Sequence, residues 1–231
     1  MTHAELDHLV IAAASLGEGV AWCEATLGVT PGPGGEHALF GTHNRLLKLD
    51  SPHTPNVYLE IIAINPATVP TRPAPLKRWF DLDDTQLRAS LERHGPQAIH
   101  WVARVPHLAK ALAAWRALGF DRGDPLTASR PTPQGLLQWQ ISVRDDGQRL
   151  FDGCLPTLIE WGNTHPAATM PASGLRLVRL KVTHPQAMQL AAAFAAIGLT
   201  STDASPGPSQ LSVELITPKG TVTLNTRPIN T

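Results

Sequence analysis

Four side chains able to bind a metal ion recur at matched places in two copies of one local pattern. His8 and His100 each lie in a short apolar segment, LDHLVI and AIHWVA, while Glu60 and Glu160 lie in later apolar segments, VYLEII and TLIEWG. An imidazole or carboxylate among apolar residues costs free energy unless it is paired or bound. Two neutral imidazoles and two carboxylates would balance the charge of a divalent ion, so the pattern predicts a metal site shared between two halves of the chain.

The segments that would hold these residues follow a repeat. A strand beginning near Leu6 precedes a helix that opens with a capping box, Ser15 followed by Glu18, and ends at a glycine. The same order returns with a strand at 99–102 and once more with a strand at 178–182. The distance from strand to terminating glycine is conserved across the copies, at 20, 19 and 19 residues for His8 to Gly28, His100 to Gly119 and Arg179 to Gly198.

Three strand-sized segments follow each of these glycines. We expect them at 36–41, 44–50 and 56–64, then at 121–129, 135–145 and 149–161, and finally at 199–203, 209–217 and 220–226. Each copy is therefore predicted to form a strand-helix-strand-strand-strand (βαβββ) unit. One such unit leaves an apolar sheet face uncovered, so two units must pair to bury it.

The predicted fold belongs to the α+β class, with paired βαβββ modules forming a curved, partly closed mixed sheet around a cleft and a third such module at the C-terminal end. The expected bounds are 1–65 for module one, 66–96 for a proline-rich linker with a short helix, 97–166 for module two and 174–231 for module three. The third copy has Arg179 in place of the His, and its last strand, TVTLNT, has no Glu. It cannot supply the ligands, which leaves it a structural role, a role as a lid, or a contact between protomers.

The composition narrows the class of protein. Lys and Arg together number 19, as do Asp and Glu, so the formal charge is zero and a nucleic-acid partner is not expected. Cys23 and Cys154 form no spaced metal motif and fit a reducing compartment. The N-terminus has no signal-peptide pattern, and no apolar run is long enough to span a bilayer. We therefore expect a cytoplasmic protein with no membrane partner.

This layout resembles the vicinal oxygen chelate superfamily, which includes glyoxalases, bleomycin-resistance proteins and dioxygenases and pairs βαβββ modules around a divalent metal. More narrowly, the chain resembles the glyoxalase-like domain family. The most specific local match is the stretch from His37 to Leu47, HALFGTHNRLL, followed by YLEII at 58–62. The superfamily resemblance covers about residues 5–165. It implies a fold and a style of chemistry but no substrate, because the superfamily hosts several reactions.

By position, His8, Glu60, His100 and Glu160 match the two-His, two-Glu ligand set of the glyoxalase I branch. The resemblance implies a Zn, Ni, Fe, Co or Mn ion that holds two oxygens of a small substrate and stabilises an enediolate. Glu60 or Glu160 would then remove a proton next to a carbonyl, and the sequence does not choose between them. The reaction implied is that of a lyase or isomerase. The third copy departs from the two-module layout, which leaves a homodimer open.

A second group of polar residues is expected to contact the substrate. Between the strands of copy one lie His37, Thr42, His43 and Asn44, which offer hydrogen-bond donors and acceptors, although Gly-Thr-His-Asn is also a reasonable loop. Gln138 and Gln140 are further candidates for facing the cleft. Strand alternation, by contrast, points Trp101 and Trp161 away from the cleft and into the core, since they directly follow His100 and Glu160.

Two other functions remain open at this level. A metal-free protein could use the same cleft to bind and sequester a small molecule without turning it over. An extradiol-type Fe(II) dioxygenase is the third reading, but it would place a two-His, one-carboxylate set mainly in a single module, and this sequence departs from that pattern.

Overall fold

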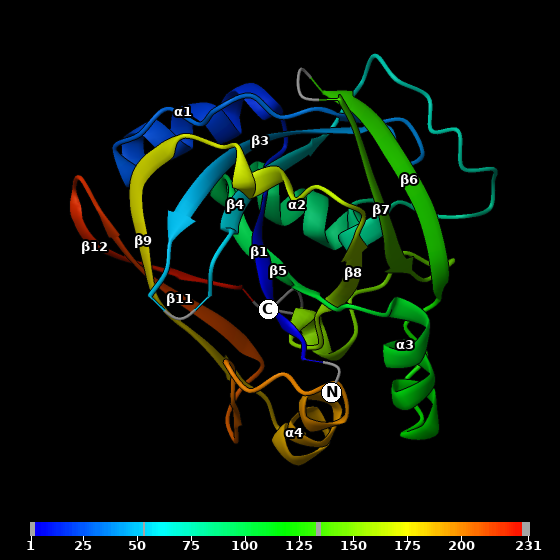
Figure 1. Cartoon of the computed structure of the whole chain (residues 1–231). Coiled ribbons are helices and arrows are strands. Elements are labelled where there is room, and N and C mark those ends of the chain that lie inside the picture. Colours follow the sequence, from blue (N-terminus) through cyan, green and yellow to red (C-terminus); the bar gives the residue numbers. More distant parts are fainter. Residues whose placement is uncertain (1–2, 53, 133–134, 228–231) are drawn as a thin grey trace.

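The computed structural model describes residues 3–52, 54–132 and 135–227. These residues form an α+β fold in which twelve strands make one open, mixed sheet (Figure 1), so the predicted fold class is confirmed. No helix of the described ranges is long and apolar enough to cross a membrane.

The predicted βαβββ order occurs three times along the chain. The first module contains β1 (Glu5–Ala12), α1 (Leu16–Leu27), β2 (Glu36–His37), β3 (Thr42–Asp50) and β4 (Val57–Ile64). The second contains β5 (Gln97–Arg104), α3 (Leu108–Ala117), β6 (Asp124–Thr132), β7 (Gly135–Val143) and β8 (Thr157–Trp161). The third contains β9 (Ala172–Thr183), α4 (Ala187–Ala196), β10 (Ala204–Ser205), β11 (Gln210–Thr217) and β12 (Gly220–Asn225).

Shorter elements connect the modules. Between the first and second lie the 3₁₀ turn η1 (Trp79–Asp81) and α2 (Thr85–His94), while η2 (Phe151–Gly153) precedes β8 and η3 (Pro166–Ala168) precedes β9. The strand predicted at 149–161 is therefore shorter than expected. Phe151 and Asp152 have φ of 54° and 52°, a left-handed backbone that cannot continue a strand.

Local signals set the helix ends as predicted. The Ser15 side chain accepts a hydrogen bond from the Glu18 backbone N–H, which satisfies one of the free amides at the start of α1. Gly28 ends the helix with φ of 75°, a conformation that glycine adopts without the steric cost of a Cβ.

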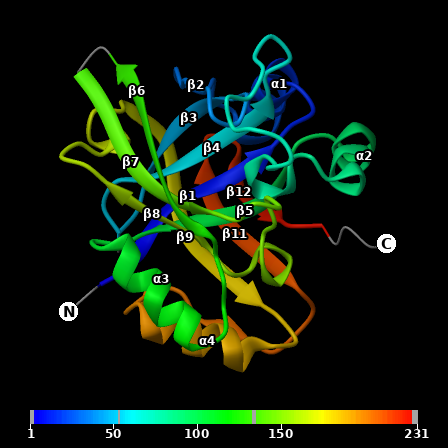
Figure 2. The ribbon, with the colours of Figure 1, turned by 90° about the vertical axis from the view of Figure 1, so that its right-hand side faces the viewer.

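The first two modules meet at the centre of the sheet, where β1 pairs antiparallel with β5. The full order is β12-β11-β9-β3-β4-β1-β5-β8-β7-β6, with β2 beside β3 and β10 beside β9. The third module joins at the β3 edge through a parallel β9 and curls beneath the centre of the sheet, as the two views in Figures 1 and 2 show.

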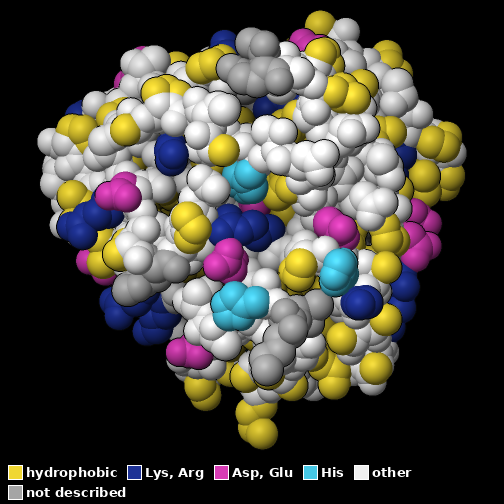
Figure 3. Space-filling view, in the orientation of Figure 1, with side chains coloured by type: hydrophobic (Ala, Val, Ile, Leu, Met, Phe, Trp, Pro, Cys, Tyr) yellow, Lys and Arg dark blue, Asp and Glu magenta, His cyan; other side chains and the backbone are white. Residues whose placement is uncertain are grey.

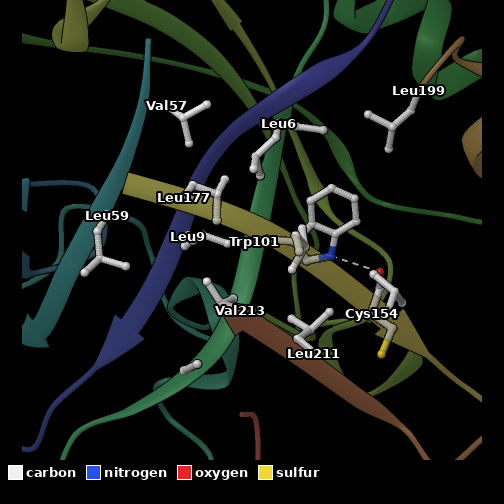
Figure 4. Packing of buried hydrophobic residues seen from close by; sticks show 14 of the residues in the cluster. Leu6, Leu9, Val57, Leu59, Trp101, Cys154, Leu177, Leu199, Leu211 and Val213 are labelled. Atoms are coloured by element: carbon white, nitrogen blue, oxygen red, sulfur yellow. Dashed lines mark hydrogen bonds between the residues drawn. The ribbon is translucent and has the colours of Figure 1, made fainter. Parts of the chain in front are cut away.

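The main core lies between the central strands and this third module. Trp101 of β5 is fully buried among side chains from β1, β4, β9 and β11, including Leu9, Leu177 and Leu211, and its indole N–H donates to the Cys154 carbonyl (Figure 4). The prediction that Trp101 faces the core is confirmed. The third module therefore covers one face of the central sheet.

The opposite face of the central sheet lines the cleft. Its apolar side chains form a second cluster with Trp79 and Phe80 of η1 and with Leu87 and Leu91 of α2. Phe80 has φ of 59°, which costs a non-glycine residue about 1–2 kcal/mol. The turn that carries this strain holds the Phe80 ring in the cleft, where it lies 5.0 Å from the Trp79 ring and nearly parallel to it.

Candidate functional site

The site begins at an irregularity in β1. The pairing between β1 and β5 joins Leu6 to Ala103 and then His8 to Val102, so Asp7 is an extra residue in a β-bulge. Neighbouring residues of a regular strand point to opposite faces, but here the Asp7 carboxylate reaches the adjacent imidazole, with its Oδ1 2.6 Å from His8 Nδ1.

Asp7 is a fully buried carboxylate with three hydrogen-bond donors. Besides His8, the Trp161 indole N–H lies 2.8 Å from Asp7 Oδ2, and His165 Nε2 lies 2.9 Å from the same oxygen. Burial by itself raises the pKa of Asp7, but the hydrogen bonds from His165 and His8 outweigh it and hold the pKa well below its usual range. The ionised carboxylate can only accept, so His8 carries its proton on Nδ1 and presents Nε2 to the pocket.

Glu60 lies on the other side of His8 and is fixed by a neighbouring amide. Its Oε1 accepts a hydrogen bond of 2.6 Å from Asn44 Nδ2, and its Oε2 lies 3.6 Å from His8 Nε2. Asn44 is oriented in turn by the Gly35 backbone N–H, which donates to Asn44 Oδ1. His8 and Glu60, matched by sequence position, are therefore brought together.

His37 completes this network. The second N–H of the Asn44 amide donates to His37 Nε2 at 3.3 Å, and His37 Nδ1 lies 3.0 Å from Thr42 Oγ1. Burial, followed by repulsion from Arg130, His8 and His43, lowers the pKa of His37 to about 3. A neutral His37 fits its role as acceptor from Asn44, so a continuous polar chain runs from Thr42 through Glu60 and His8 to Asp7.

A small pocket opens beside these groups; with the solvent at its mouth it takes in about 410 Å³ of space. Its polar lining includes His8, His37, Asn44 and Glu60, and its aromatic walls are Tyr58, Trp79, Phe80, Trp139 and Trp161. The Tyr58 ring stacks on the His8 imidazole with 4.5 Å between centroids. Burial, followed by the charges of Asp7 and Glu60, raises the pKa of Tyr58 well above its usual value, so its hydroxyl is neutral. We call this space the inner pocket.

Arg130 of β6 also lines the inner pocket. Its guanidinium packs so closely on Gly35 that a Cβ at that glycine would overlap it. It makes no hydrogen bond or ion pair with the residues that the structure describes, so its charge remains available to a ligand. Lys or Arg, His, and Asp or Glu side chains lie interspersed near the middle of this face of the molecule, among apolar ones (Figure 3).

His100, the counterpart of His8, is committed to other contacts. Its Nδ1 donates to the Gly153 carbonyl at 3.0 Å, and its Nε2 accepts from the Thr157 backbone N–H and from the Arg122 guanidinium. Burial and the charges of Arg122 and Arg149 lower the pKa of His100 well below its usual value. The Nε2 lone pair that a metal would need already accepts hydrogen bonds. The Arg122 guanidinium, a fixed cation, lies 3.0 Å from that nitrogen.

Glu160 does not correspond to Glu60 in the sheet. In the first module, Val10 of β1 lies two residues after His8 and pairs with Glu60. In the second, Val102 lies two residues after His100 and pairs with Thr157. Glu160 instead accepts a hydrogen bond of 2.6 Å from the Leu108 backbone N–H at the start of α3. Glu160 is thus bound at the helix N-terminus, where a carboxylate is favoured.

These contacts do not fit the expected ligand set. No group of three or more His, Cys, Asp or Glu side chains among the described residues is arranged to hold a metal ion. His8 and Glu60 offer two donor atoms to the pocket. His100 does not, because Arg122, Thr157 and the Phe80 ring, whose centroid is 5.3 Å from that of the imidazole, surround it. A divalent ion bound by all four predicted residues is therefore incompatible with this arrangement.

The other sequence candidates divide between the pocket and the surface. His37 and Asn44 line the inner pocket, and Thr42 supports His37 from behind. His43 is not among the residues lining it, and Gln138 and Gln140 are exposed, because Leu137, Trp139 and Ile141 take the inward positions of β7. The prediction that Trp161 faces the core was wrong, since β8 points Ile159 and Trp161 into the cleft and Leu158 away from it.

Sequence reasoning missed Asp7, Tyr58, Arg130 and Arg122 as members or neighbours of the site. Asp7 directly precedes His8, and this adjacency is the only local signal in the sequence that points to Asp7. Arg122 and Arg130 come from a strand region in the second module whose register the sequence does not fix.

The comparisons with known proteins agree with the fold. A solved structure of a hypothetical protein from Staphylococcus aureus superposes with a TM-score of 0.58 at 12% identity, covering 96% of this chain and 85% of that one. Methylmalonyl-CoA epimerase of Streptomyces coelicolor, solved with 2-nitronate-propionyl-CoA, gives 0.42 at 17% identity over 69% of this chain and 96% of that one. The Mycobacterium tuberculosis epimerase gives 0.39 at 16%, over 71% and 91%.

At 12% identity the Staphylococcus aureus structure bears on the fold alone, and the epimerase superpositions, with TM-scores below 0.5, support no conclusion about this chain. The sequence matches none of the curated proteins with which it was compared. The model of the glyoxalase-like domain matches residues 6–198, which includes both modules around the inner pocket and the first part of the third. The chain therefore belongs to the glyoxalase-like domain family, as its sequence pattern predicted.

Proposed function

We propose that the protein is a small-molecule isomerase or lyase that transfers a proton at a carbon next to a carbonyl group, using His8 and Glu60. The observation that carries this proposal is the spacing of 3.6 Å between His8 Nε2 and Glu60 Oε2 at the wall of an aromatic pocket. Both groups are held from behind, by Asp7 and Asn44, so their free atoms face the ligand space.

The two groups have different roles in this scheme. Glu60 Oε2, which faces His8 across the pocket, removes the proton from carbon and returns it. In this scheme His8 takes a second proton on Nε2, the Asp7 carboxylate stabilises the resulting positive charge, and Nε2 donates a hydrogen bond to the carbonyl oxygen as negative charge develops there. Return of the proton to a neighbouring carbon gives an isomer, and loss of a leaving group gives the product of a lyase.

The reaction as proposed does not depend on a metal ion. The notion of a Zn, Ni, Fe, Co or Mn ion came from four matched residues, and His100 and Glu160 have their donors and acceptors engaged elsewhere. The charge that such an ion would offer the developing enolate is supplied in this scheme by His8 with its second proton.

Deuterium exchange tests the proposal without a known substrate. The protein is incubated in D₂O with a panel of small 2-oxo acids, 2-hydroxy ketones and acyl thioesters. Exchange at the carbon next to the carbonyl is followed by NMR. We expect exchange with at least one compound class, and a loss of about 100-fold or more in Glu60→Gln and in His8→Gln. Glu92→Gln, on the exposed side of α2, is the matched control and should retain the full rate.

A metal-free binding protein is the second candidate, and the aromatic enclosure of the inner pocket favours it. Stacked Trp79 and Phe80 rings, with Trp139 and Trp161 opposite, would hold a planar ligand without any reaction. Binding of panel compounds, seen as thermal stabilisation, with no exchange in any of them would support this candidate and contradict the enzymatic one.

A further inference from the structure

A second hollow adjoins the inner pocket on its open side. It encloses about 1130 Å³ of space, part of it open to solvent, and runs between β3, the ends of β6 and β7, and the segment that leads into the third module. We call it the outer groove. Four residues line both spaces, namely Leu46, Arg130, Leu137 and Pro166, so a single ligand can extend from one into the other.

The wall of the outer groove is largely apolar, as expected of a site that binds an apolar chain. Leu46, Leu47, Pro131, Leu137, Met170 and Pro171 contribute carbon surface to it. Its described lining contains no Asp or Glu, and its charged members are the two cations Arg130 and Lys48. An uncharged tail would therefore lie on an apolar surface, and an anionic group would find positive charge but no carboxylate to repel it.

Arg130 stands where the two spaces join. The Gly35 backbone beneath its guanidinium donates to Asn44, which in turn holds Glu60, so Gly35 and Asn44 connect the cation to the proposed base. A planar guanidinium without a protein partner can bind a carboxylate with two parallel hydrogen bonds. A carboxylate there would place the adjoining atoms of its molecule in the inner pocket and leave the rest of the chain to the groove.

From these observations we infer that the substrate is an amphipathic carboxylic acid: its carboxylate binds Arg130, its reactive carbonyl lies between His8 and Glu60, and its apolar chain occupies the outer groove. This inference rests on the proposed function for the reactive carbonyl, but the binding of head and tail does not. The segment at 164–173, which forms one side of the groove, belongs to the connection into the third module. The third module thus contributes to ligand selection as well as to the core.

Chain-length dependence of binding tests the inference. Straight-chain alkanoates from acetate to dodecanoate, each below its micelle concentration, are titrated into the full chain by calorimetry. We expect affinity to rise by up to about fourfold for each methylene and then level off when the chain outgrows the groove. Alcohols of equal length should bind at least about tenfold more weakly than the acids because they lack the charge that Arg130 recognises.

Three variants assign these effects to named residues. In Arg130→Met the acids should lose their advantage and bind like the alcohols. In Ala172→Trp, which fills the groove from an exposed position on its wall, long acids should bind no better than short ones. Ala168→Trp places the same ring on an exposed residue outside the groove lining and should bind like the parent.

Equal affinity for acetate and decanoate, or equal losses in Ala172→Trp and Ala168→Trp, would overturn the inference. An equal loss for acids and alcohols in Arg130→Met would overturn the assigned role of that side chain. The deuterium-exchange result is independent of these outcomes: long acids that bind without exchange of the keto analogues would contradict the proposed reaction alone, and exchange without chain-length dependence would contradict the amphipathic substrate alone.

Discussion

Thr157 stands in the second module where Glu60 stands in the first. Each lies in the last strand of its module, opposite the residue two positions after the module's histidine. Glu60 faces His8 across the inner pocket, whereas the Thr157 hydroxyl and the Arg122 guanidinium enclose His100. The pseudo-symmetric skeleton therefore holds one histidine that faces the inner pocket and one that is enclosed by the second module.

This asymmetry predicts that the protein does not hold a stoichiometric metal ion at the four predicted residues. Protein purified without chelators and dialysed against Zn, Ni, Fe, Co or Mn should show well under one ion per chain by elemental analysis, since His100 has no free lone pair. The same content should be found in His8→Ala and in Glu60→Ala. A full equivalent in the parent protein that is absent from both variants would contradict the metal-free reaction.

Replacing Asp7 with Asn should test the effect of Asp7 on His8 while leaving the shape of the pocket intact. The amide retains the shape but removes the charge that fixes the Nδ1–H tautomer and stabilises protonated His8, so we expect the exchange rate to fall by about 10²–10⁴-fold. Circular dichroism should show an intact fold. An unchanged rate would contradict the role of Asp7 as the positioning residue.

Asp7 also predicts an acid-sensitive stability. Its pKa in the folded protein lies well below that of the unfolded chain, about 3.9, so its contribution is present above that pH and is lost as the pH falls below it. Urea unfolding between pH 6 and pH 2.5 should show a decline in the free energy of unfolding that is shallower in Asp7→Asn. Two parallel curves would contradict the depressed pKa.

The buried histidines predict a second decline at milder pH. Burial lowers the pKa of His37 to about 3, so the unfolded chain binds a proton below about pH 6.5 while the folded chain does not. Stability should therefore fall by up to about 1.4 kcal/mol per pH unit for this one group as the pH drops from 6.5 toward 3. His37→Gln should make the decline shallower by this contribution, while buried His100 maintains the rest, and His94→Gln, at the exposed end of α2, should leave it unchanged.

Glu160 and Glu60 should respond differently to the same substitution. Glu160→Gln weakens the contact with the Leu108 N–H at the start of α3, and we expect a loss of about 1 kcal/mol in the free energy of unfolding with no change in exchange rate. Glu60→Gln should abolish exchange. A loss of exchange in Glu160→Gln would show that the two carboxylates share a site after all.

Much of the fold could be predicted because the signals for it are local and occur three times. The capping pair at Ser15 and Glu18, the left-handed Gly28 and the period of each strand depend on residues close together in the chain. Repetition at nearly constant spacing then gave the three βαβββ units and, through the family resemblance, the cleft. The repeat pointed to His8 and Glu60, and the polar residues between the strands of copy one pointed to His37 and Asn44; all four line the inner pocket.

The composition of the site was decided by register, which is a tertiary property. A bulge at Asp7 brought its carboxylate beside the adjacent His8 imidazole, and the register of β8 turned Trp161 rather than Glu160 toward the inner pocket. Arg130, which has no hydrogen-bond or ion-pair partner among the described residues, became a candidate only when β6 was placed across the cleft from β3. The sequence by itself thus determined the repeated skeleton and one histidine–glutamate pair, because strand period and turn chemistry depend on residues close together in the chain. Only the tertiary structure decided that the second half is closed by Arg122 and Thr157, because a shift of one residue in a strand reverses which side chains meet.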